Sequence, residues 1–177
     1  MNAIGKFMIV ISLSLIFLSA CASAQTAPPI DFKEPDPETY VRLMPVIREY
    51  FYLRKQSTLS GDTTPFFQRY PALAEGMETE KGINIESKHF AGMQDFDLVD
   101  GNFFPEYYEK IKISQNDTEW RVLVHGMGLY AYRDADGMIN ESGGEFKIVF
   151  LLQEKDDTFM ITQTDEVTLA EWKDFTP

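Results

Sequence analysis

Histidine and tyrosine side chains are the first candidates for chemistry in this sequence, because imidazole and phenol groups can transfer protons. His125 lies within a long apolar stretch, and Tyr50, Tyr70 and Tyr107 could supply phenols beside it. None of these residues belongs to a catalytic motif. A histidine satisfied within the core or a groove is the simpler interpretation, so the sequence predicts no catalytic residue.

Metal binding has one candidate loop. The segment Asp134-Ala135-Asp136-Gly137 resembles the middle of an EF-hand calcium loop, where alternating carboxylates wrap one cation. In that register the two end positions, which must supply ligands, fall on Tyr132 and Gly143, so a solvated hairpin turn is the better interpretation. The chain has two histidines and one cysteine, too few for a common zinc site. We expect no cofactor.

The single cysteine, Cys21, follows an apolar stretch at residues 7–18 that begins just after Lys6. About 12 apolar residues are too few to cross a hydrocarbon core of about 30 Å, so the stretch reads as a signal peptide. The motif Leu18-Ser19-Ala20-Cys21 resembles the lipobox of bacterial lipoproteins. That resemblance implies cleavage before Cys21 and acylation of its thiol, for example with palmitate.

The membrane would then be a partner through the lipid. Two or more acyl chains give lasting attachment, whereas one anchors only marginally. Ala22 follows the cysteine in place of the Asp that retains lipoproteins in the inner membrane, so the outer membrane is favoured if the cell has two. The alternative is free secretion, because Ala22-Ser23-Ala24 also fits a cleavage site that would leave Gln25 first. Both alternatives place the domain outside the cytoplasm.

Composition and charge limit the possible partners. The formal net charge is -12. This charge opposes binding to nucleic acid and to anionic lipid headgroups, because a protein binds both through clustered basic residues. With 44% hydrophobic and 14% aromatic residues, a single core can form without metal or disulfide. We therefore expect a signal peptide at residues 1–20, a lipidated Pro-rich tether at 21–36 and one globular domain at 37–177.

The first half of the domain has helical signals. Asp36-Pro37-Glu38 is typical of a helix start, and an apolar stripe with the period of a helix runs from Tyr40 to Arg54. Pro45 predicts a kink or a restart, and Ser60-Gly61 predicts the end. A second short helix is expected from Thr64-Pro65 to Tyr70, with one further turn at residues 71–76. Residues 78–104 should form short pieces broken by three glycines: Gly82, Gly92 and Gly101.

The second half has the alternation of strands. Strands are expected at residues 107–114, 120–133, 145–153 and 158–167, joined by turns at 115–117, 134–144 and 156–157. Consecutive strands with short connections predict an antiparallel meander. Both faces of residues 120–132 hold apolar side chains, so either the sheet curls around a pocket or a partner covers its outer face.

Helices followed by a curved antiparallel meander resemble the nuclear transport factor 2-like, or cystatin-like, cone fold. The resemblance rests on element order and on two strand-like stretches, residues 120–130 and 162–167. It implies an α+β class with N-terminal helices packed on a curved sheet of four or more antiparallel strands. It also implies that the cone mouth can form a ligand pocket and that dimers through the sheet are common. The residues proposed to line such a pocket are Phe67, Tyr70, Tyr107, Trp120, His125 and Tyr130.

The leading functional hypothesis is a non-enzymatic, membrane-anchored binding module at the cell envelope, with a small apolar ligand or an envelope protein as its partner. The first alternative is an enzyme of the isomerase or cyclase type, which requires a deep cavity holding His125 or an Asp with a raised pKa. The second is a structural homodimer through the outer sheet face. An anchor and spacer in front of a domain without a catalytic motif favour the binding module.

Overall fold

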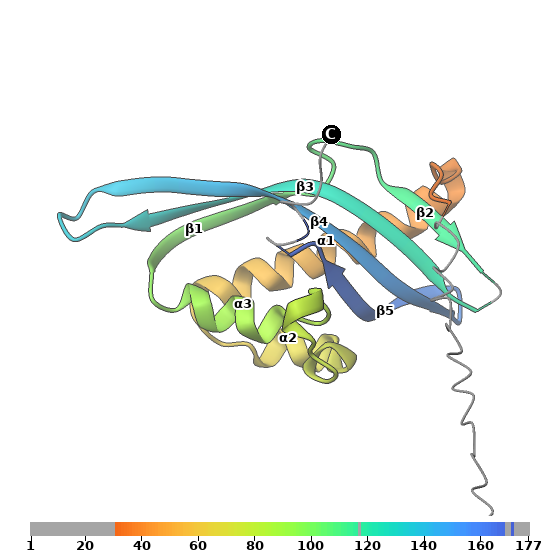
Figure 1. Cartoon of the computed structure of the whole chain (residues 1–177), viewed down its shortest axis with the longest axis horizontal. Coiled ribbons are helices and arrows are strands. Elements are labelled where there is room, and N and C mark those ends of the chain that lie inside the picture. The colour runs from red at the N-terminus through yellow and green to blue at the C-terminus, as the bar shows by residue number, and fades with distance from the viewer. Residues whose placement is uncertain (1–30, 117, 169–170, 172–177) are drawn as a thin grey trace, which may run out of the picture.

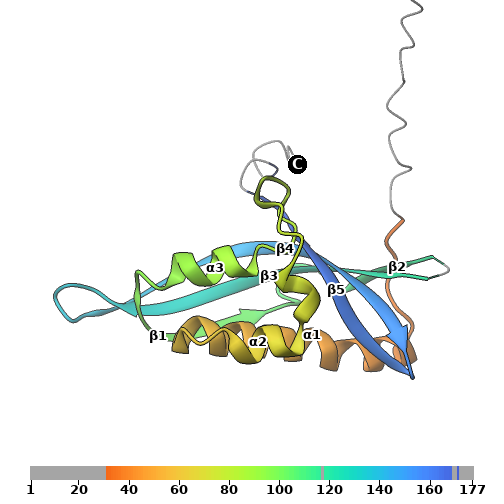
Figure 2. The ribbon, with the colours of Figure 1, turned by 90° about the horizontal axis from the view of Figure 1, so that it is seen from below.

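The computed structural model describes residues 31–116, 118–168 and 171. Within these residues, the helices lie on one face of a five-stranded antiparallel sheet (Figures 1 and 2). We call the helix-covered side the inner face and the opposite side the outer face. The expected α+β class, with N-terminal helices packed on an antiparallel sheet, is confirmed.

Helix α1 (Pro37–Ser60) begins and ends at the predicted residues. The side chain of Asp36 accepts a hydrogen bond from the backbone N–H of Thr39 at 2.9 Å, which caps the first turn. Gly61 ends the helix in the left-handed region, with φ of 73°. The helix continues through Pro45, so the restart, one of the two outcomes expected there, does not occur. The lost bond falls on the carbonyl of the exposed Val41, where water can replace it.

The shorter helices follow the predicted order at first. Helix α2 (Thr64–Arg69) and the 3-10 turn η1 (Pro71–Ala74) are where the prolines indicated them. A second 3-10 turn, η2 (Thr79–Lys81), precedes helix α3 (Glu86–Met93). Gly92 lies inside α3, so the expected break there is wrong. This glycine is tolerated because α3 is held by the packing of Phe90, which is 2% exposed, against the core.

The sheet has the strand order β1-β3-β4-β5, and β2 also pairs with β3. Its strands are β1 (Asp97–Phe104), β2 (Lys112–Gln115), β3 (Trp120–Arg133), β4 (Ile139–Lys155) and β5 (Thr158–Glu166). Strand β3 has the predicted bounds. It pairs with β4 along its whole length, from Trp120 opposite Leu152 to Arg133 opposite Ile139.

Three predictions that concern the strands are wrong. The strand expected from Tyr107 begins only at Lys112, because the chain after Phe104 turns before it pairs with β3. Gly101 lies within β1, and the turn expected at residues 134–144 is a tight one, so Gly143 and Gly144 belong to β4. A side chain at Gly143 would collide with the carbonyl oxygen of Gly128 on the neighbouring strand. That glycine therefore permits close pairing where the sequence indicated a turn.

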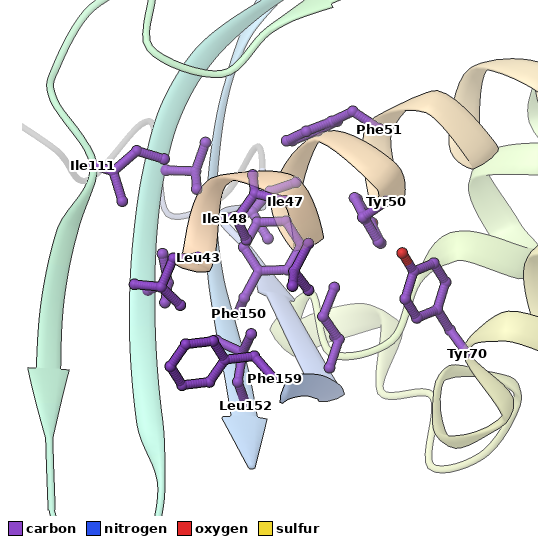
Figure 3. Close-up of a cluster of buried hydrophobic side chains, with 14 of the residues drawn as sticks. Leu43, Ile47, Tyr50, Phe51, Tyr70, Ile111, Ile148, Phe150, Leu152 and Phe159 are labelled. Atoms are coloured by element: carbon purple, nitrogen blue, oxygen red, sulfur yellow. The ribbon is translucent and has the colours of Figure 1, made fainter. Parts of the chain in front are cut away.

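The core lies between α1 and the inner face of the sheet (Figure 3). The even-numbered residues of β3 point toward it, which agrees with the two-residue period of a strand. Aromatic rings dominate this core: the ring centroids of Tyr50 and Phe150 lie 4.8 Å apart in an edge-to-face arrangement. The central buried side chains include Leu43, Ile47, Tyr50, Phe66, Val122, Val124, Ile148, Phe150 and Leu152.

The start of the described chain joins the sheet. Lys33, inside the predicted tether, exchanges two backbone hydrogen bonds with Ile113 at 2.9 and 2.7 Å. The signal peptide, Cys21 and most of the predicted tether lie outside the described residues. Among the helices that are described, none has the length and apolar character needed to span a membrane.

Candidate functional site

His125 does not serve a pocket on the inner face. Its odd-numbered position on β3 places its side chain on the outer face, where its ring stacks on Tyr108 with centroids 4.8 Å apart. Its Nε2 atom lies 2.6 Å from Oε1 of Glu145, and its Nδ1 lies 3.3 Å from Oε1 of Glu109. The expectation that His125 lines a cone pocket is therefore wrong, because the register of β3 turns it away.

The other five predicted pocket residues do not gather around one pocket. Tyr70 is 2% exposed within the core, and Phe67 packs against that core. Trp120 packs on Phe159 at the start of β3, and Tyr107 is 61% exposed after β1. Tyr130 alone of this group lines the pockets described below. The six predicted residues therefore do not form one site.

The calcium-like loop is a hairpin turn. Oδ1 of Asp134 accepts hydrogen bonds from the backbone N–H groups of Asp136 at 3.0 Å and Met138 at 2.9 Å, and Oδ2 accepts one from the side chain of Asn140 at 2.6 Å. Within the described chain, no group of three or more His, Cys, Asp or Glu side chains is placed to hold a metal ion. The side chain of Asp134 therefore stabilises its own turn.

An apolar pocket of about 280 Å3 opens on the inner face. It lies between the end of α3 and the part of the sheet formed by β1, the end of β3 and the start of β4. Met93 supplies the helix side, and Leu98 from β1 lies opposite Tyr132 of β3. Gly144 of β4 leaves part of the pocket floor without a side chain. The full lining is Met93, Phe96, Leu98, Tyr130, Tyr132, Ser142, Gly143 and Gly144.

A polar pocket of about 420 Å3 adjoins it, and Met93 lines both. Its walls come from α1, α3 and the end of β5, which contribute Arg54, His89 and Glu166. The Nε2 atom of His89 lies 3.2 Å from the hydroxyl of Tyr130, so the two pockets also touch through this pair. We call the two pockets together the inner-face groove.

Buried charges lie beneath the polar pocket. The Nη2 atom of Arg54 lies 3.0 Å from Oε2 of Glu166, and the side chain of Arg54 is only 4% exposed. Glu86 is 2% exposed, and its Oε1 accepts hydrogen bonds from the hydroxyl groups of Tyr50 at 2.8 Å and Thr164 at 2.6 Å. Charges buried this deeply need partners to offset their desolvation. The network thus ties α1, α3 and β5 together at the groove.

Burial and the charge of Glu166 fix the protonation of the groups that line the groove. Burial, followed by the charge of Arg54, lowers the pKa of His89 from 6.5 to about 2. Burial raises the pKa of Tyr130 to about 12, although Arg54 opposes this shift. For Arg54, burial favours the neutral form, but the charge of Glu166 prevails and the pKa rises. At neutral pH the groove therefore presents a neutral imidazole, a protonated phenol and a paired guanidinium.

This arrangement suits hydrogen bonding better than proton transfer. An efficient general base has a pKa near the working pH, and a group with a pKa of about 2 is far below it. The isomerase or cyclase alternative required His125 or an Asp with a raised pKa inside the cavity. Burial does raise the pKa of Asp165, but Asp165 pairs with Val149 and lies on the outer face. The groove lacks the groups proposed for that reaction.

Sequence reasoning missed His89 and Glu166 in the groove, and the buried Glu86 beneath it. One signal was present: Arg54 falls within the apolar stripe of α1, and a cation at such a position must find a buried carboxylate. The partner could not be named from the sequence, because Glu166 follows 112 residues later on the last strand. His89 lies in a polar stretch that shows neither the apolar periodicity of a helix nor that of a strand.

No family model matches the chain, and no curated protein matches it. Solved structures with some likeness include Aln2 from a Streptomyces species, with a TM-score of 0.48, 14% identity and coverage of 76% of this chain and 93% of that one. A second is a candidate dehydratase from the NTF2-like family of Streptomyces avermitilis, with a TM-score of 0.46, 13% identity and coverage of 73% and 97%. A third is the intermembrane space region of the chloroplast protein ARC6, with a TM-score of 0.42, 12% identity and coverage of 77% and 99%. At these TM-scores the likenesses carry no argument about activity, and membership of the nuclear transport factor 2-like superfamily stays a prediction.

Proposed function

We propose that this chain is a lipid-anchored binding module of the cell envelope, which holds a partner in the inner-face groove without transforming it. The lipobox at Leu18-Ser19-Ala20-Cys21 supports the anchor. The Pro-rich segment behind it would hold the domain away from the membrane. The acidic surface, with a net charge of -12, would keep the domain itself off anionic headgroups.

The observation that carries the binding role is the pairing of an apolar pocket with a polar one across Met93. Binding sites commonly combine apolar walls with a few fixed polar groups that orient the ligand. Here the polar groups are His89, Tyr130 and Arg54. Burial keeps the imidazole and the phenol neutral, and the carboxylate of Glu166 keeps the guanidinium charged. Such groups can orient a ligand but are poorly suited to exchange protons with it near neutral pH.

A pair of glycine variants tests the groove. A Cβ atom at Gly144, on the floor of the apolar pocket, or at Gly92, beside the polar pocket, would meet no atom within 4 Å. Gly144→Leu should therefore fill the apolar pocket, and Gly92→Leu should crowd the polar one, while both variants stay folded. Indole, a neutral and water-soluble aromatic, serves as the probe in a protein-observed NMR titration of the full, lipidated chain.

We expect indole to shift the amide signals of Gly143, Gly144 and Tyr130. Gly144→Leu should abolish these shifts, and Gly92→Leu should retain them. Shifts that persist in Gly144→Leu, or that fall on the outer face alone, would contradict the groove as the binding site. Recovery of a chemically altered compound after incubation with the chain would contradict the non-enzymatic role.

The outer face supports a second candidate, the homodimer. It carries several large exposed side chains, with exposed fractions of 43% for Phe104, 43% for Tyr108 and 37% for Leu129. An exposed apolar patch commonly marks an interface. Leu129→Lys places a charge in this patch, and light scattering should then report a monomer where the unmodified chain is a dimer. Equal masses for the two proteins would remove this candidate.

A further inference from the structure

Strand β4 has an unpaired edge beyond the end of β5. Strand β5 ends at Glu166, opposite Ile148, while β4 reaches back to Ile139 (Figure 1). The last bond across this edge is donated by the N–H of Val167 to the carbonyl of Lys147 at 2.9 Å. Thr168 then bonds Glu171 through its backbone N–H and its hydroxyl, as at the start of a helix. No described segment pairs with residues 139–146 on this side.

The register identifies the groups that this edge presents. In an antiparallel strand, the N–H and C=O of one residue point to the same side, and the side alternates along the strand. Since Lys147 points its carbonyl toward β5, and the pairing with β3 has no shift, Glu145, Gly143 and Glu141 point theirs the same way. Residues 141–145 are all exposed. Such a row of free backbone groups can template the addition of a further strand.

The apolar pocket lies next to this edge. Gly143 and Gly144 belong both to the free edge and to the pocket lining. A strand added beside them would alternate its side chains between the two faces, and those on the inner face would enter the pocket. The pocket volume of about 280 Å3 is slightly below the range of about 300 to 1,000 Å3 that small-molecule sites occupy. It suits side chains of a peptide better than a complete small ligand.

Charge selects the kind of strand. The side chains of Glu141 and Glu145 are on the outer face of β4, because odd positions there point away from the helices. A second copy of this chain, added by the same edge, would bring its own glutamates against them, and like charges opposite each other are destabilising. A strand with Lys or Arg on its outer face would instead pair with them. The net charge of -12 favours the approach of such a strand.

We propose that the free edge of β4, residues 139–146, binds an extended basic peptide segment of a partner protein as an additional strand. Alternate apolar side chains of the segment enter the apolar pocket, and the intervening basic side chains lie beside Glu141 and Glu145. This inference rests on the proposed function, because it names the partner class of the same groove. Backbone hydrogen bonds hold the segment at the edge of β4. The pocket selects apolar side chains of the segment, and the two glutamates select basic ones.

The test uses a fluorescent synthetic peptide of about ten residues, in which lysine alternates with valine or leucine, binding to the full, lipidated chain. A second peptide replaces every lysine with glutamate, and a third carries N-methyl groups on alternate amides. Glu141→Pro removes the edge N–H together with the charge, and Glu141→Ala removes the charge alone. Proline is tolerated on an edge strand when its missing N–H faces solvent, so the variant should fold.

We expect fluorescence polarisation to show binding of the basic peptide, weakened about tenfold by N-methylation or by Glu141→Pro and less by Glu141→Ala. Gly144→Leu should weaken binding by a similar factor, and the glutamate peptide should not bind. Equal affinity for the methylated and unmethylated peptides, or for the Glu141→Pro and Glu141→Ala chains, would overturn strand addition. If the indole shifts at Gly144 persist while no peptide binds, this inference fails and the proposed function stands; if both are absent, both fail.

Discussion

His89 should make the stability of this domain depend on pH in a specific way. Its pKa falls from 6.5 to about 2 on folding, because burial and the charge of Arg54 disfavour the imidazolium form. The folded state therefore favours the neutral ring. The stabilisation is complete above the unfolded pKa of 6.5 and is lost as the pH falls toward the folded value of about 2.

The size of the loss follows from these two values. Linkage gives a decrease in the free energy of unfolding of about 2 kcal/mol between pH 7 and pH 5, and about 3 kcal/mol by pH 4. The loss at pH 5 is nearly the same for any folded-state pKa below about 4, since the folded domain then stays unprotonated at that pH. The prediction depends on the burial of His89 beside Arg54 and little on the depth of the shift.

Urea unfolding of the unmodified chain and of His89→Gln at pH 7, 6 and 5 measures this effect. Glutamine keeps a polar group near Tyr130 but does not titrate in this range. Contributions from the other titratable groups are common to both proteins, so they cancel in the difference. We expect the stability of the unmodified chain relative to the variant to fall by about 2 kcal/mol from pH 7 to pH 5. A difference that stays constant with pH would refute the burial of a neutral His89.

Three further tests concern the anchor, the buried ion pair and the packing of the sheet. Cys21→Ser should move the protein from the membrane pellet to the soluble fraction, and an unchanged pellet would contradict lipid anchoring. Glu166→Gln leaves the charge of Arg54 buried without its partner, so urea unfolding should show a loss of about 3 kcal/mol; a loss under about 1 kcal/mol would indicate that water reaches the guanidinium. Gly126→Ala would press its Cβ against the carbonyl of Phe104 and should lower the free energy of unfolding by about 2 kcal/mol. In the control Gly144→Ala the Cβ meets no atom, so stability should change by less than about 0.5 kcal/mol. Equal effects of the two variants would refute the close packing at Gly126.

Local signals predicted much of this fold. The cap at Asp36, the helix end at Gly61 and the bounds of β3 depend on neighbouring residues, which a sequence displays directly. Two of the errors arose at glycines that a tertiary contact requires. Gly101 and Gly143 both lie within strands, and each must be glycine because of its neighbour. A side chain at Gly101 would press on the ring of Tyr130, and a side chain at Gly143 would collide with the backbone of β3. Their role depends on which strand lies beside them, and the sequence does not state that.

The candidate site was less predictable. His125 drew attention as a histidine in a long apolar strand, but a shift of one residue in register decides which face a side chain takes. His89 acquires its burial and its lowered pKa only when α3 packs beside Arg54 and Tyr130. These contacts join residues far apart in the chain. The groove is therefore formed by tertiary contacts. The one local signal of it in the sequence is the arginine in the apolar stripe of α1.

Photo-crosslinking in intact membranes gives the most direct test of the inner-face groove as the binding site. The photoreactive residue p-benzoylphenylalanine would replace Phe96, an exposed ring that lines the apolar pocket, in one chain and Leu129, on the outer face, in another. We expect an adduct from position 96 that the basic lysine peptide suppresses, and no such adduct from position 129. A partner captured from position 129 alone would contradict binding in the groove, because the outer face would then be the binding surface.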